Sequence, residues 1–349
     1  DWSGSCPSLL LEPSRTNLTA NSEYTSVTNG SVTYNDAISP EGVQNAVKIT
    51  ATSAAFPRFF STTTLGGGNT YIVSFYVKKG VGDGVGLYGY SSVNYNNVVR
   101  FNLDTNEVTY LQTAFSNGYI EDAGNGWKRC VATLTTPSTG SWSGINAVIN
   151  KSNFLQAEIG DEHYFYGMQV EQDATYPTSY IPTYGVSQTR LDDLATDSGD
   201  VNTFNSTEGV FYFEGNAFVS DPSAEGQIYI YNDSGSELIS IRFNRISANN
   251  IFVGMAGTTG ASGFIQNNSV DLTNTFKLAL KYSVGSWKLY VNGNLLGTTN
   301  ATTFAANSLN SLNLSSSLGT IPFIGNAKQF LIFPTALSDD ECIALTTIT

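Results

Sequence analysis

The chain has 349 residues, a formal net charge of −13 and only 13% charged residues, about half the usual ~25%. This length accommodates two domains of typical size. A nucleic-acid partner would require a basic surface that releases counterions from phosphates, and the sequence has no cluster of lysine and arginine. No stretch approaches the ~20 apolar residues that span a bilayer. We therefore expect neither a nucleic-acid partner nor insertion into a membrane.

The three cysteines, Cys6, Cys130 and Cys342, are far apart in the sequence and match no zinc-site spacing. One disulfide with a free thiol is compatible with this number, but we expect three small, buried apolar side chains. No signal peptide is visible. The chain begins at Asp1 without a methionine, so we expect further sequence upstream.

The first half of the chain has the pattern of extended strands. The apolar triplet Leu9–Leu11 predicts a short buried strand that Pro13 ends. From about residue 45 to 185 the polarity alternates with a period of two, most clearly in Tyr71–Lys78 and Trp127–Leu134. Turn residues separate these runs, as in a sandwich or jelly roll. We expect Trp127 to be a core anchor.

The second half repeats this style after a break. Residues 182–206 show little alternation and predict a domain boundary near residue 190. Later, Trp287–Val291 alternates and enters the Asn292-Gly293 turn, the strongest short-range hairpin signal. Ser338 precedes three acidic residues and predicts the N-cap of one short helix. The fold class is therefore all-β: two antiparallel β-sandwich (jelly-roll) domains in tandem, residues 1–190 and 191–349, with one short C-terminal helix.

Several stretches resemble modules of known families. The first half resembles a module that is widespread in bacteriophage tail-fibre and related virion proteins, and such modules are similar to jelly-roll carbohydrate-binding domains. The second half resembles the laminin-G/concanavalin-A-like sandwich. The first resemblance rests on Cys6–Leu18, Tyr71–Gly80, Gly126–Arg129, Met168–Glu171 and Tyr176–Thr183, and the second on Phe276–Tyr282, Trp287–Gly293 and Ala336–Leu345.

Glycan binding needs flat aromatic faces for the C–H surfaces of a sugar and planar polar groups for its hydroxyls. Tyr88 and Tyr90 have the same strand parity, so both side chains can point to one face. Trp142 lies between small polar residues and is a second candidate platform. The candidate glycan-binding residues are Tyr88, Tyr90, Tyr95, Asn97, Arg100 and Trp142.

A structural Ca²⁺ is the metal that the resemblance implies, because such jelly rolls often bind one between the N-terminal segment and the last strand. It implies Glu12, Asn17 and Glu171 as neighbours of the ion. Ca²⁺ requires six to eight oxygen ligands, and backbone carbonyls supply part of them. The sequence contains no EF-hand loop, and the alternative without a metal stays open.

Catalytic signals are weak. His163 is the only histidine, it lies on a predicted strand, and no G-x-S-x-G turn accompanies it. Carboxylates at Glu158, Asp161 and Glu162 fall in a predicted turn, and the sequence lacks the E-x-D-x-x-E arrangement of concanavalin-like glucanases. We therefore expect a protein that is not an enzyme.

The resemblance implies a bacteriophage virion protein of tail-fibre or spike type, located in the virion, that recognises or attaches to host-surface glycans. Its expected partners are a host glycan, other virion proteins and further copies of itself, with a trimer suggested by virion analogy. Two alternatives stay open. The chain could instead be a pair of accessory glycan-binding modules of an extracellular or bacterial-surface enzyme that degrades polysaccharide, or a structural or decorating virion protein without a ligand.

Overall fold

A computed structural model describes residues 8–23, 26–60, 64–91, 97–112, 114–139, 142–151, 153, 155–218, 225–258 and 262–348. Almost all regular structure in these residues is β-strand, with the single short helix α1 (Asp339–Thr346). The predicted all-β class is therefore confirmed. Contacts divide the chain into two compact units: Ser14–Arg190, here called the first sandwich, and Leu191–Thr349 with the N-terminal segment that ends at Pro13, here called the second sandwich.

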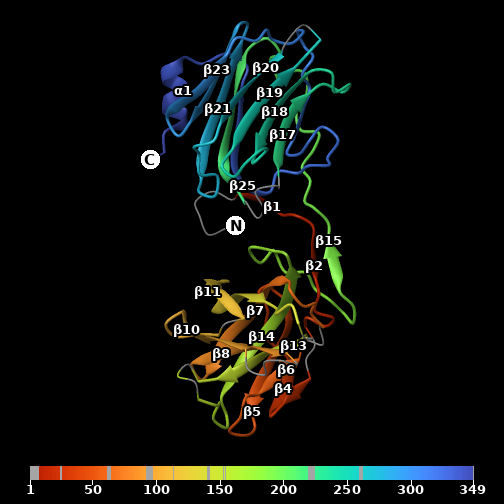
Figure 1. The fold of residues 1–349 in the computed structure, drawn as a ribbon, viewed down its shortest axis with the longest axis vertical. Helices are drawn as coiled ribbons and strands as arrows, with labels where there is room; N and C mark the ends of the chain where they lie inside the picture. The colour runs from red at the N-terminus through yellow and green to blue at the C-terminus, as the bar shows by residue number, and fades with distance from the viewer. Residues whose placement is uncertain are drawn as a thin grey trace. The chain divides into compact units, whose positions relative to one another are not determined.

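The first sandwich contains two six-stranded antiparallel sheets and a short strand pair (Figure 1). One sheet has the order β11 (Phe115–Asp122), β12 (Trp127–Thr135), β7 (Thr70–Val81), β14 (Glu162–Gln172), β5 (Gln44–Ala51), β4 (Gly30–Ile38). The other has the order β10 (Glu107–Leu111), β9 (Asn97–Asn102), β8 (Gly84–Ser91), β13 (Trp142–Asn150), β6 (Arg58–Phe60), β3 (Val27–Thr28). Strands β15 (Gln188–Arg190) and β2 (Arg15–Asn17) form the pair.

The core of the first sandwich lies between its two sheets. Alternate residues of β7, including Val73, Phe75 and Val77, face alternate residues of β8 and β13, including Leu87 and Ile145. Each of these side chains is at most 1% exposed. The period-two pattern of the sequence thus places one apolar row of every central strand in the interior.

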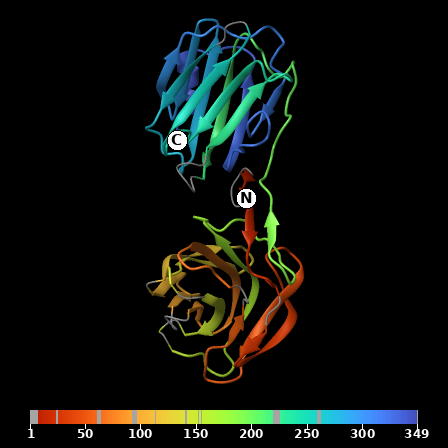
Figure 2. The ribbon, with the colours of Figure 1, turned by 45° about the vertical axis from the view of Figure 1, so that its right-hand side comes forward.

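The second sandwich has the same two-layer construction (Figure 2). One sheet has the order β1 (Leu9–Leu11), β25 (Gly325–Phe333), β16 (Gly209–Ala217), β21 (Phe276–Ser283), β22 (Ser286–Val291), β23 (Asn294–Thr299). The facing sheet has the order β20 (Ser262–Asn267), β19 (Ile251–Ala256), β18 (Leu238–Phe243), β17 (Gly226–Tyr231), β24 (Ser311–Asn313).

Strand β1 differs from the expectation in two respects. It pairs with β25, so it belongs to the second sandwich rather than to a domain that comprises residues 1–190. Only Leu11 is buried, while Leu9 and Leu10 are 48% and 37% exposed. Leu10 points to the opposite face of this edge strand from Leu11, whereas Leu9 shares the face of Leu11 and is exposed at the beginning of the strand.

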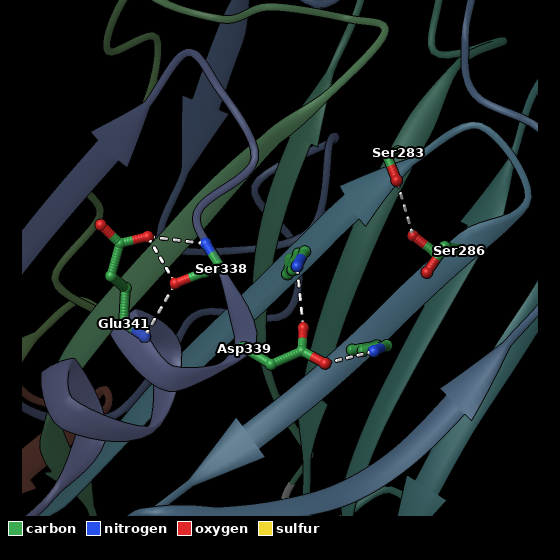
Figure 3. Close-up of polar contacts among 7 residues, drawn as sticks. Ser283, Ser286, Ser338, Asp339 and Glu341 are labelled. Atoms are coloured by element: carbon green, nitrogen blue, oxygen red, sulfur yellow. Dashed lines mark hydrogen bonds and ion pairs between the residues drawn. The ribbon is translucent and has the colours of Figure 1, made fainter.

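Helix α1 covers the outer face of the β1–β23 sheet, where Tyr212, Tyr290 and Cys342 pack together. The Ser338 hydroxyl accepts from the Glu341 amide and the Glu341 carboxylate accepts from the Ser338 amide, which confirms the predicted N-cap and completes a capping box (Figure 3). Asp339 forms ion pairs with the ammonium groups of Lys281 and Lys288 on the sheet below. These two hydrogen-bonded lysines lower the pKa of the Asp339 carboxyl.

Candidate functional site

A cavity of about 590 Å³ lies on the outer side of the first sandwich, beside Trp127. Three parts of the chain form it: the end of β4 with the turn that follows, the β11–β12 turn, and the middle of the sheet at β7 and β14. Its volume falls in the range of known small-molecule pockets. We call it the Trp127 cavity; it is lined by Asp36, Ala37, Ile38, Ser39, Pro40, Gly42, Lys78, Asn125, Trp127 and Tyr164.

The β11–β12 turn explains why a cavity forms here. Gly124, Asn125 and Gly126 all have positive φ, between 51° and 81°, and such a run favours glycine and asparagine. The turn closes when the Trp127 amide donates to the Gly124 carbonyl at 2.8 Å. The indole N–H of Trp127 donates to the carbonyl of Ile38 at 2.9 Å and so joins this turn to the end of β4. Trp127 is 1% exposed, so it closes the back of the cavity and offers a ligand little surface.

Polar side chains in this cavity are free for a ligand. Within the described part of the chain, Lys78, Asn125 and Tyr164 form no side-chain hydrogen bond or ion pair, and Lys78 and Tyr164 are half-buried. The hydroxyl of Ser39 is buried without a hydrogen-bond partner. A buried polar atom without a partner costs about 1–3 kcal/mol, so such atoms are rare unless water or a ligand satisfies them.

The charge of the cavity is mixed. Asp36 forms an ion pair with Lys48 at 3.0 Å, and Lys48 lies 4.0 Å from a Glu162 oxygen. The hydrogen bond to Asp36 is the main cause of the raised pKa of Lys48. Among the described residues that line the cavity, Lys78 is therefore a cation without an ion-pair partner, and its ammonium group can donate to a ligand.

A smaller hollow of about 300 Å³ shares Asn125 and Trp127 with the Trp127 cavity. Its own polar groups are already used. The Lys128 ammonium donates to the carbonyl of Leu103 and to the Asn106 side chain, and Asp122 accepts from the amide of Gly124 at 2.9 Å. We therefore assign the smaller hollow to the internal structure of the turn.

The sequence-predicted glycan cluster lies on the other sheet of the first sandwich. Tyr88 and Arg100 share its outer face, and an Arg100 N–H donates to the Tyr88 hydroxyl at 3.1 Å. Both are buried, at 8% and 6% exposed, and the ring of Phe56 lies 5.6 Å from that of Tyr88. Burial raises the pKa of Tyr88. Tyr95 and the side chains of Tyr90 and Asn97 lie outside the described residues.

Sequence reasoning missed Asn146, which pairs with Tyr88 across β13 and β8. It is 1% exposed, and neither its amide nitrogen nor its amide oxygen forms a hydrogen bond. Partners directly opposite on antiparallel strands point to the same face, so this amide lies beside the Tyr88–Arg100 pair. Only the alternation of β13, in which Ile145 and Ala147 face the core, marks Asn146 as outward-facing.

The structure places Trp142 in the core of the first sandwich instead of on a ligand surface. Its side chain is 0% exposed, and a ring without a free face cannot stack on a sugar. A Cβ atom on Gly89 would lie 2.2 Å from the ring, so glycine at position 89 leaves space for this indole. The small polar neighbours of Trp142 in the sequence suggested an exposed ring. The space that buries the ring is provided by Gly89 on the neighbouring strand β8, which those neighbours do not reveal.

The residues expected near a calcium ion do not fit one as they stand. Asn17 is 0% exposed, and its side-chain oxygen already accepts from the amides of Thr19 and Val170. Glu171 accepts from the amide and hydroxyl of Thr178, and Glu12 belongs to the second sandwich. In the described residues, no group of three or more His, Cys, Asp or Glu side chains is arranged to bind a metal. Calcium binding stays a prediction.

His163 and two of the three cysteines are internal. His163 is 0% exposed, its Nδ1 accepts from the Gly80 amide at 3.1 Å, and burial lowers its pKa to about 4. Cys130 and Cys342 are buried free thiols, as expected, while Cys6 lies outside the described residues. These positions do not test whether the protein is an enzyme.

The sequence matches no protein-family model and no curated protein. Among solved structures, the sialidase carbohydrate-binding module CBM40 of Ruminococcus gnavus, bound to alpha2,3 sialyllactose, is 17% identical, with a TM-score of 0.36 over 44% of this chain and 94% of that chain. Sheep galectin-11 is 11% identical, with a TM-score of 0.28 over 40% and 96%. Domains LG4-5 of the mouse laminin alpha1 chain are 10% identical, with a TM-score of 0.28 over 96% of both chains. These likenesses are too distant to carry an argument about function.

Proposed function

We propose that this chain is a non-enzymatic glycan-binding protein and that the Trp127 cavity receives a sugar. The observation that carries the proposal is the set of polar groups without internal partners, Ser39, Lys78 and Asn125, in a cavity of about 590 Å³. An ammonium and an amide donate to sugar hydroxyls, and the half-buried ring of Tyr164 offers apolar contact for sugar C–H groups. A neutral or mildly polar sugar suits this mixture of charges.

We further propose that the protein is a bacteriophage virion component of tail-fibre or spike type that attaches to host-surface glycans. The support is the resemblance of Cys6–Leu18 and Tyr176–Thr183 to tail-fibre modules. A weak single site is compatible with this role, since several copies in one virion raise avidity without new contacts. In the described residues, no helix is long and apolar enough to span a membrane.

The accessory module of a polysaccharide-degrading enzyme and the ligand-free virion protein are the competing assignments. The first shares the glycan ligand and differs in having a catalytic domain in the same gene product, so the complete gene decides it. The second predicts that the Trp127 cavity binds no sugar, so a binding experiment decides it.

The test is a glycan array that includes host-surface polysaccharides, probed with the wild-type chain and three conservative variants. Lys78→Gln removes the charge, Tyr164→Phe removes one hydroxyl, and Asn125→Gly removes the amide while tolerating φ of 51°. Lys328→Gln, an exposed lysine of β25, is the matched charge control. We expect each cavity variant to bind the glycan at least fivefold more weakly than wild type does, because the loss of one hydrogen bond costs about 1 kcal/mol of binding free energy. Absence of wild-type binding, or equal binding by all variants, would refute the proposed site.

A further inference from the structure

The outer face of the β17–β20 sheet in the second sandwich carries a row of aromatic and guanidinium groups. Neighbouring strands contribute one residue each, and the residues that alternate with them, such as Ile241 and Val253, are buried in the core. We call this row the aromatic ladder; its members are Tyr229 on β17, Arg242 on β18, Phe252 on β19 and Phe264 on β20.

Two rings of the ladder stack on each other, and the outer one, Phe264, is exposed. The rings of Phe252 and Phe264 are 5.5 Å apart and nearly parallel, at 15°. Phe264 is 61% exposed, which leaves on the order of 120 Å² of a side chain of about 200 Å² in contact with solvent. The opposite outer face of this sandwich is covered by α1, whereas no described element covers Phe264.

The two arginines of this face have different electrostatic states. Arg242 is neutralised, since it lies 3.5 Å from a Glu225 carboxylate and donates to the Tyr229 hydroxyl at 2.8 Å. The guanidinium of Arg245 lies 4.4 Å from the centre of the Phe252 ring and is exposed. It forms no hydrogen bond or ion pair with the described residues, so its N–H donors are available. A guanidinium presents these donors in a planar fork that matches a carboxylate.

We propose that the aromatic ladder and Arg245 bind an acidic glycan, with a sugar ring stacked on Phe264 and the sugar carboxylate bound by Arg245. The flat ring of Phe264 supplies apolar contact to C–H groups, and the guanidinium of Arg245 supplies the charge complement. A second copy of the chain is a poorer occupant because a stable interface buries about 800 Å² per partner, several times the exposed area of Phe264. This site is on a different unit from the Trp127 cavity and does not depend on it.

The experiment uses the full chain on an array in which each carboxylated oligosaccharide is printed beside its carboxyl-reduced form. Short oligosaccharides at 0.15 M salt keep the chain's net charge of −13 from repelling the ligand, since screening acts over about 8 Å. Wild type should bind at least one acidic member fivefold or more above its reduced partner. Arg245→Gln should abolish that preference, and Phe264→Ala should weaken binding of both forms at least fivefold.

Two exposed positions of the same sandwich provide matched controls: Lys328→Gln for charge and Leu318→Ala for apolar area, since Leu318 is 85% exposed. Both should bind like wild type. Lys78→Gln separates the two proposals, because it should change the cavity's ligands and leave the carboxylate preference intact. The inference is overturned if no carboxylated glycan exceeds its reduced partner, if Arg245→Gln retains the preference, or if Phe264→Ala instead shifts the sedimentation of the free protein, which would indicate a self-association face.

Discussion

The buried histidine makes a quantitative prediction about acid stability. His163 is 0% exposed and packs against Phe165, at a ring distance of 6.3 Å. Burial is the main cause of its low pKa of about 4; Lys79 lowers it further, while Asp161 and Asp83 act in the opposite direction. Its Nδ1 accepts from the Gly80 amide, and a protonated imidazole would lose that acceptor. The neutral form is therefore the one that the folded first sandwich requires.

The sign follows from proton binding. An unfolded histidine has a pKa near 6.5 and takes up its proton before the folded one, so the stabilising contribution is complete above pH 6.5 and decreases as the pH falls toward 4. The difference between 6.5 and about 4, at about 1.4 kcal/mol per pH unit, lowers the free energy of unfolding by up to about 3 kcal/mol at pH 4.

The assay is urea unfolding followed by tryptophan fluorescence at pH 7.0, 5.5 and 4.0, for wild type and His163→Asn. An asparagine oxygen can accept from the Gly80 amide but does not titrate. All carboxylates are common to both proteins, so their contributions cancel in the difference between the two pH profiles. Wild type should lose about 3 kcal/mol more than the variant between pH 7 and 4. Parallel pH profiles would show that His163 is protonated in the folded state at its ordinary pKa, and would refute the reasoning.

Four further predictions use the same unfolding assay or the glycan array. Asn146→Leu should raise the free energy of unfolding by about 1–2 kcal/mol, because two unpaired amide atoms leave the interior; an unchanged or lower value would mean that the amide is satisfied. Gly89→Ala should destabilise by roughly 1–3 kcal/mol, since its Cβ would meet the Trp142 ring at 2.2 Å; a neutral result would show that the ring can move. Ser338→Ala should cost about 1 kcal/mol of helix capping, and wild-type stability would argue against the cap. Tyr88→Phe should lower glycan binding about fivefold if the predicted cluster is a third ligand site, because the variant lacks the hydroxyl that would bond the sugar; wild-type affinity would show that this hydroxyl bonds no ligand.

Local patterns were sufficient for several strands and for one hairpin turn of the two sandwiches. The alternation in Tyr71–Lys78 and Trp127–Leu134 corresponds to β7 and β12, which pair with each other. Asn292 and Gly293 both have positive φ, at 49° and 77°, as the predicted hairpin requires. Ser338 is the N-cap because a side-chain acceptor three residues before Glu341 can satisfy a free helical amide whatever the rest of the fold does.

Features that depend on distant residues could not be read from local patterns. Strand β1 pairs with β25 across more than 300 residues, and no pattern within Leu9–Leu11 specifies that partner. The exposure of Trp142 was misjudged for the same reason, since the space for its ring comes from Gly89 on the neighbouring strand. Alternation gives the parity of a strand but not which of its two faces another element covers.

The Trp127 cavity illustrates why the sequence also missed the better-formed site. Its free polar groups, Ser39, Lys78, Asn125 and Tyr164, are spread over more than 120 residues and come together only when β4, β7, β12 and β14 join one sheet. The Gly124–Trp127 turn borders two hollows that share Asn125. In the smaller one the side chains of Lys128 and Asp122 are already bonded, whereas the Trp127 cavity also contains Ser39 and Lys78 without partners in the described residues. Only the folded chain shows which polar groups already have hydrogen-bond partners. This property distinguishes a ligand site from a structural crevice, and residue type alone does not reveal it.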